Sequence, residues 1–99
     1  METKIVTKQK NEVKMKKPKQ YKVVMYNDDY TTMEFVINIL VNVFNKKLID
    51  AEKIMIDVHE RGKGVAGIYS YDIASTKVLA AMSRAKEKSF PFKLTLEEA

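Results

Sequence analysis

Hydrophobic residues recur at two spacings along this chain, and each spacing indicates one kind of secondary structure. In residues 20–26 every second residue faces the same way, which is typical of a strand. That face carries Tyr21, Val23 and Met25. After a polar turn the spacing changes to three or four, which predicts a helix. Its apolar face carries Met33, Val36, Ile37, Leu40 and Phe44, and its polar face carries Asn38, Asn42 and Asn45.

Local signals predict where this helix begins and where a second one lies. Thr31 precedes Glu34 at the spacing of a capping box, so we expect the first helix to begin there. The second helix begins near Asp50 and ends at Gly62, because glycine is common just past a helix C-terminus. It turns Ala51, Met55 and Val58 inward and carries His59 in its last turn.

The last third of the chain adds a strand, a helix and a strand. Residues 64–71 predict a strand in which Gly67 marks a bulge or a close backbone approach. Asp72 is the expected N-cap of a third helix, which Pro91 ends. The helix packs through Ala74, Val78, Ala81, Met82 and Ala85, and the final strand alternates Phe92, Leu94 and Leu96. The order β-α-α-β-α-β predicts an α+β sandwich, a small antiparallel sheet covered by three helices.

The net charge of +5 lies entirely in the first part of the chain. Residues 1–19 hold seven lysines against two glutamates, whereas residues 20–99 hold eleven basic and eleven acidic residues. Residues 1–18 have too few apolar side chains to fold, so we expect a disordered basic arm followed by one core domain over residues 19–99. A nucleic-acid reader would be expected to carry a basic face on its folded domain. The charge distribution therefore disfavours that class.

Composition also limits the chemistry and the compartment. The chain has no cysteine and one histidine, which excludes disulfides and thiolate zinc sites. No apolar run is long enough to span a membrane, and the first residues lack the apolar core of a signal peptide. We expect a cytoplasmic monomer that needs no cofactor or metal and contacts neither nucleic acid nor a membrane.

The turn between the first strand and the first helix carries the most distinctive chemistry. Asn27, Asp28 and Asp29 place an amide and two carboxylates side by side. Adjacent acids in a turn most often bond backbone amides, and this run lacks the ligand spacing of a calcium loop. As a catalytic pair they would need a nucleophile or metal that the chain does not supply. Met33 and Met55 are either core residues or the lining of an adaptable apolar pocket.

Two blocks of residues together resemble the ClpS family of adaptors, which hand proteins with destabilising N-terminal residues to Clp ATPases. The first block is Asn27-Asp28-Asp29-Tyr30-Thr31, followed by Met33-Glu34-Phe35-Val36. The second comprises Met55, Val58, His59, Gly62, Gly67, Ala74, Thr76, Lys77 and Val78. The resemblance covers about residues 19–98 and implies the fold shared with the C-terminal domain of the ribosomal stalk protein.

The resemblance also implies a role for particular residues. The free α-amino group of a substrate would be held by Asn27, Asp29 and His59, while Asp28 shapes the turn. The bulky side chain of an N-terminal Leu, Phe, Tyr or Trp would enter a pocket, with Met33 as a gate against Val and Ile. That pocket would be lined by Thr31, Met33, Val36, Met55, Val58 and Phe92.

Partners follow from the same resemblance. Asp72 and Lys77 match the residues that contact a ClpA- or ClpC-type AAA+ ATPase, and the basic arm matches the extension needed for delivery. The chain departs from the family pattern at some positions. Thr32 stands where ClpS proteins usually have proline, and Phe92 stands where they commonly have leucine. The alternative is a ribosome-associated or nucleic-acid-binding domain that uses the arm. The third and least favoured interpretation is a hydrolase that uses Asp28, Asp29 and His59. We expect no enzymatic activity.

Overall fold

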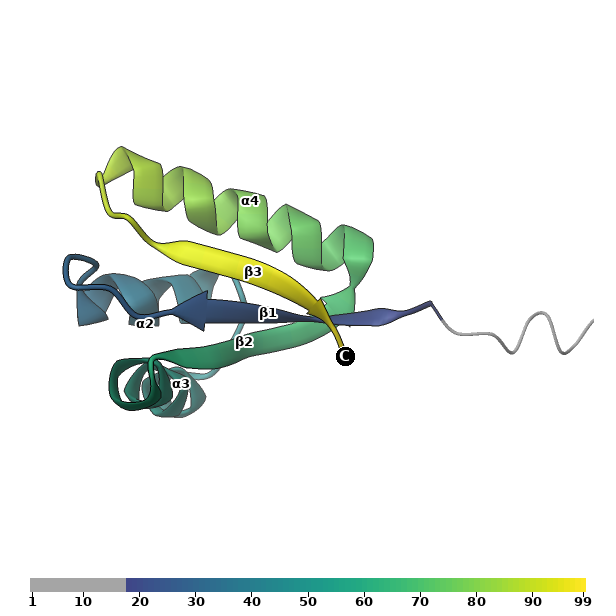
Figure 1. Cartoon of the computed structure of the whole chain (residues 1–99), viewed down its shortest axis with the longest axis horizontal. Coiled ribbons are helices and arrows are strands. Elements are labelled where there is room, and N and C mark those ends of the chain that lie inside the picture. Colours follow the sequence, from purple (N-terminus) through teal and green to yellow (C-terminus); the bar gives the residue numbers. More distant parts are fainter. Residues whose placement is uncertain (1–17) are drawn as a thin grey trace, which may run out of the picture.

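A computed structural model describes residues 18–99 and contains the predicted order of elements (Figure 1). Apart from Pro18, the predicted basic arm lies outside the described residues. The strands are β1 (Gln20–Tyr26), β2 (Lys63–Ser70) and β3 (Lys93–Glu98). The helices are α2 (Met33–Asn42), α3 (Leu48–Arg61) and α4 (Tyr71–Glu87). The predicted α+β class is confirmed.

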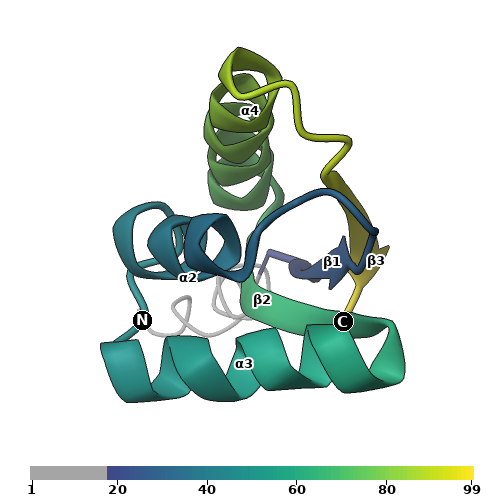
Figure 2. The same ribbon diagram turned by 90° about the vertical axis from the view of Figure 1, so that its left-hand side faces the viewer.

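The three strands form one antiparallel sheet in the order β2-β1-β3. The first strand is therefore central, which explains its apolar sequence, and α2 lies between α3 and α4 (Figure 2). The largest fully buried side chains come from β1 and from α2 with the residues just after it; they are Phe44, Met25, Ile39, Leu40 and Val23. Helix α3 packs Ala51 and Val58 onto this core.

The start of α2 corrects the predicted capping residue. Thr32, not Thr31, is the N-cap, and its hydroxyl oxygen accepts a hydrogen bond from the amide of Phe35 at 3.1 Å. Thr31 is unavailable because its hydroxyl donates to Asp28 at 2.7 Å. Thr32 thus satisfies a helix N–H that a residue with no side-chain acceptor, such as proline, would leave open.

Helix α4 also differs from the prediction at two points. It begins at Tyr71 with Ser70 as N-cap, so Asp72 lies inside its first turn. The earlier start accompanies an edge-to-face contact between the rings of Tyr71 and Tyr21, whose centroids are 5.4 Å apart. Met82 is 37% exposed and was wrongly predicted to pack. The buried face is set by Ala74, Ala81 and Ala85, and Met82 lies one position, about 100°, off it.

Strand β2 contains the predicted bulge, next to Gly67, and Gly67 is approached by a side chain and not by another backbone segment. The register shifts where Val23 pairs with Gly67 and Val24 with Val65, which leaves Ala66 as the extra residue of a bulge. A Cβ at Gly67 would clash with the ring and the hydroxyl oxygen of Tyr69. Glycine therefore makes room for the Tyr69 ring, whose hydroxyl donates to the carbonyl of Phe44 at 3.1 Å.

Candidate functional site

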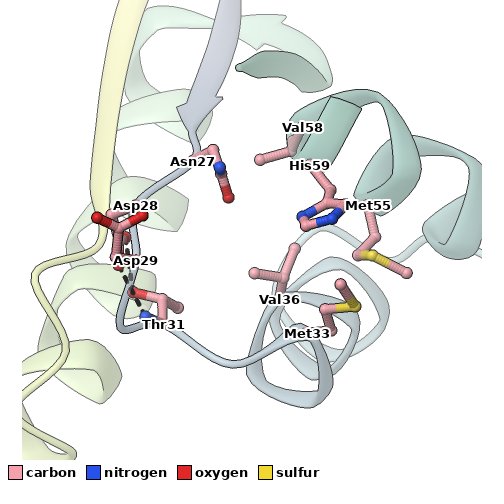
Figure 3. A pocket seen from close by; sticks show the side chains of 9 residues that line it. All are labelled: Asn27, Asp28, Asp29, Thr31, Met33, Val36, Met55, Val58 and His59. Carbon is pink, nitrogen blue, oxygen red and sulfur yellow. Dashed lines mark hydrogen bonds between the residues drawn. The ribbon is translucent and has the colours of Figure 1, made fainter. Parts of the chain in front are cut away.

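A cavity of about 290 Å³ opens between the β1–α2 turn, the start of α2 and the end of α3 (Figure 3). One wall is polar and comes from the turn, while the floor and the opposite wall come from the two helices. The lining residues are Asn27, Asp28, Asp29, Thr31, Met33, Val36, Met55, Val58 and His59. Nine of the ten residues predicted for the amine and side-chain sites therefore meet at one place.

Gly62 brings Asn27 and His59 together although they are far apart in the sequence. Gly62 ends α3 in a left-handed conformation with φ of 90°, which glycine adopts at little cost. Its carbonyl then accepts a hydrogen bond from the backbone amide of Asn27 at 2.9 Å. This bond joins the end of β1 to the end of α3, and the Asn27 and His59 side chains approach the cavity from different walls (Figure 3).

Asp28 holds the turn in shape. One carboxylate oxygen accepts hydrogen bonds from the amides of Tyr30 at 2.8 Å and Thr31 at 2.7 Å. The other accepts from the Thr31 hydroxyl at 2.7 Å. Partial burial raises the pKa of the Asp28 carboxyl, but these bonds outweigh it and hold the pKa below its ordinary value of 3.8. With its oxygens occupied by the turn, Asp28 leaves Asp29 as the exposed carboxylate of the pair.

The role of Asp28 predicts an acid-dependent stability. Because its pKa is lower in the folded protein, the carboxylate stabilises the fold above its unfolded pKa of about 3.9. That contribution is lost as the pH falls through the lower folded value. We expect Asp28→Ala to be less stable than wild type at neutral pH, with the difference shrinking below pH 3.8. Urea unfolding across pH measures this, and a difference that persists at the lowest pH would contradict it.

The apolar part of the cavity combines two side chains in fixed positions with two flexible ones. Val36 and Val58 are buried, so their positions are fixed by the core. Met33 is 48% exposed and Met55 is partly buried, and both have several rotatable bonds. The two methionines come from different helices and face the cavity (Figure 3). The site can therefore adjust to apolar groups of different shape without moving its helices.

Phe92 lies elsewhere, contrary to the expectation that it lines the pocket. It is 3% exposed and packs edge-to-face on Phe35, with ring centroids 5.6 Å apart. The backbone just before β3 directs this ring into the core beneath α2. Phe92 is thus a core residue in this structure and is absent from the cavity lining.

Asp72 and Lys77 lie apart from this cavity, around a hollow on α4 that also includes Ile73 and Thr76. Asp72 is exposed. Lys77 is held by the fold: its ammonium donates to the carbonyl of Val43 at 2.7 Å and to the side-chain oxygen of Asn45 at 2.6 Å. It also lies 5.3 Å from the centroid of the Tyr69 ring. These contacts fix the end of α2 to α4, a role that the sequence did not indicate.

Metal sites and membrane-spanning helices are both absent from residues 18–99. No group of three histidine, cysteine or acidic side chains in this part of the chain is arranged to hold a metal ion. None of its helices combines the length and apolar character needed to cross a membrane.

Residues 16–95 match the family model described as "ATP-dependent Clp protease adaptor protein ClpS". The chain belongs to the ClpS family. Two curated ClpS adapter proteins cover most of it. The one from Acetivibrio thermocellus is 50% identical over 98% of this chain and 98% of that protein. The one from Clostridium acetobutylicum is 55% identical over 90% of this chain and 88% of that protein.

A solved ClpS structure has the same fold. Agrobacterium tumefaciens ClpS2 bound to L-phenylalaninamide matches with a TM-score of 0.79 and 38% identity, covering 84% of this chain and 100% of that one. The family resemblance predicted from the two residue blocks is therefore confirmed. Membership of the ClpS family, whose members are adaptors of the Clp protease, favours a binding protein over a hydrolase or a nucleic-acid-binding domain.

Proposed function

We propose that this ClpS protein recognises substrates by their first residue, holding the free α-amino group and a bulky side chain of Leu, Phe, Tyr or Trp. The observation that carries the proposal is the cavity itself, which places exposed acceptors beside an apolar floor. The related ClpS2 is bound to L-phenylalaninamide, a ligand with a free amine and an aromatic side chain. A cavity of about 290 Å³ suits one such side chain and little more.

The amine is held by Asn27, Asp29 and His59 in this proposal. An ammonium has three donors and no acceptor, so its site must supply acceptors. Asn27 offers an amide oxygen, Asp29 a carboxylate and neutral His59 a ring nitrogen. Each hydrogen bond to a charged group contributes about 1.5–3 kcal/mol. Asp28 acts on the amine through the turn that positions its neighbours.

The side chain enters between Thr31 and the two helices, against Val36 and Val58, with Met33 and Met55 closing around it. Burying a large apolar side chain contributes about 1.5–3 kcal/mol, similar to one charged hydrogen bond. In this proposal Met33, which is the first residue of α2 and lines the cavity, contacts the β-carbon region of the guest and excludes the branched Val and Ile. Both halves of the ligand are therefore required.

A titration of phenylalaninamide against glycinamide tests the proposal. Both carry the free amine, but only the first fills the apolar part of the cavity, so we expect glycinamide to bind about 10- to 100-fold more weakly. Nuclear magnetic resonance provides the affinity and its location through shifts of the Met33, Val58 and His59 amides. Failure of phenylalaninamide to bind, or shifts confined to other residues, would reject this function.

We further propose that the protein delivers these substrates, in the cytoplasm, to a ClpA- or ClpC-type AAA+ unfoldase, with the start of α4 as the docking face. Asp72 supplies an exposed carboxylate there, beside Ile73, which is 51% exposed. Lys77 takes part through its ammonium and through its hold on Val43 and Asn45, which fixes the adjoining surface.

A further inference from the structure

A second hollow, of about 530 Å³, adjoins the start of α2. Met33 lines the first cavity, while its two neighbours in the chain, Thr32 and Glu34, line the second. The remaining lining comes from α2 and from the end of α4 with the residues after it; these are Phe35, Asn38, Arg84, Glu87, Lys88 and Phe90. The start of α2 therefore contributes residues to both cavities.

The floor of this hollow is a fixed aromatic surface. Phe35 is 8% exposed and meets Phe90 edge-to-face, with ring centroids 5.1 Å apart. The amide of Phe90 donates to the carbonyl of Ala85 at 2.9 Å, which holds the residues after α4 in place. The floor is thus preformed, as in most sites that bind small ligands or peptides.

The rim is polar, and its charges balance. The rim carries two acidic residues, Glu34 and Glu87, and two basic ones, Arg84 and Lys88. Asn38 adds an uncharged amide. Within residues 18–99 these five side chains make no hydrogen bond or ion pair with one another or with their surroundings. A balanced set of donors and acceptors over an apolar floor suits an uncharged polypeptide backbone better than a polyanion.

We propose that this hollow is a second subsite, which receives the residues that follow the first residue of a bound substrate. The inference rests on the proposed function of the first cavity. An extended chain advances about 3.3 Å per residue, so a substrate that leaves the first cavity across Thr32 reaches the hollow within a few residues. The volume of the second hollow lies within the range of about 300–1,000 Å³ that is typical of ligand pockets.

Calorimetry with ligands of two lengths tests the subsite. Phenylalaninamide reaches only the first cavity, whereas a peptide of about six residues that begins with Phe reaches both. We expect Asn38→Ala to weaken the peptide about three- to tenfold by removing one hydrogen-bonding group, and to leave phenylalaninamide unchanged. Asn42→Ala, on an exposed residue of the same helix outside the hollow, is the matched control and should change neither.

A charge reversal tests independently whether the later residues of the substrate lie in the second hollow. Lys88→Glu makes the rim net negative, so it should favour peptides with lysine over those with glutamate at the third and fourth positions. Lys86→Glu changes the same charge on the same helix end but outside the hollow, and should leave that preference as in wild type.

The outcomes separate the two claims. If phenylalaninamide does not bind at all, the proposed function fails. If phenylalaninamide binds but Asn38→Ala and Lys88→Glu behave like their controls, only the second subsite is overturned.

Discussion

A peptide that begins with free phenylalanine is expected to bind, and its N-acetylated twin is expected to lose at least about a hundredfold in affinity. Acetylation removes the positive charge and two of the three N–H groups whose hydrogen bonds we propose that Asn27, Asp29 and His59 accept. It also adds bulk where the turn and the end of α3 meet. Fluorescence anisotropy with a label at the far end of each peptide measures the difference without touching the first residue.

The matched control uses the protein instead of the peptide. Asn27→Ala should reduce the affinity for the free peptide about tenfold and leave the weak binding of the acetylated peptide unchanged. Equal affinities for the two peptides in wild type would mean that the polar wall does not bind an ammonium, whatever the apolar part does.

Phe92→Ala is expected to lower the free energy of unfolding by about 3–5 kcal/mol, a large share of the stability of a domain this size. The ring is 3% exposed, and truncation would leave a cavity against Phe35 and the core beneath α2. Urea unfolding followed by circular dichroism measures the loss. Phe92→Leu keeps most of the apolar volume and should cost less than about 1.5 kcal/mol.

Phe92→Leu also separates a core role from a pocket role. Because Phe92 does not line the first cavity, the ratio of affinities for peptides beginning with Phe and Leu should stay as in wild type. If Phe92→Leu remains folded but changes this ratio of affinities, Phe92 contributes to the side-chain pocket after all.

Local patterns predicted the elements well. The alternation of Tyr21, Val23 and Met25 predicted a strand over residues 20–26, and Gly62 predicted the end of α3 because glycine adopts a positive φ more readily than other residues. The two adjacent threonines show the limit. Both precede the helix at usable spacings, and only the bond from Thr31 to Asp28 decides that Thr32 is the cap.

The resemblance named the nine residues that line the cavity, but it did not predict how the fold brings them to one place. Asn27 and His59 line the same cavity because the backbone amide of Asn27 bonds to the carbonyl of Gly62, and no periodicity within either segment predicts this long-range hydrogen bond. Phe92 was misplaced for a related reason. Alternation along a strand gives the face a residue occupies, whereas the resemblance supplied a pocket role that the packing on Phe35 does not support.

Helix α2 is anchored at both ends by side chains. Thr32 and the Asp28 turn fix its start, and Lys77 and Tyr69 fix the carbonyls of Val43 and Phe44 just past its end. A helix about 15 Å long, restrained in this way, has little freedom to slide or tilt. In the proposed function, differences in size among Leu, Phe, Tyr and Trp would therefore be accommodated by the side-chain torsions of Met33 and Met55, because the helix itself cannot move to accommodate them.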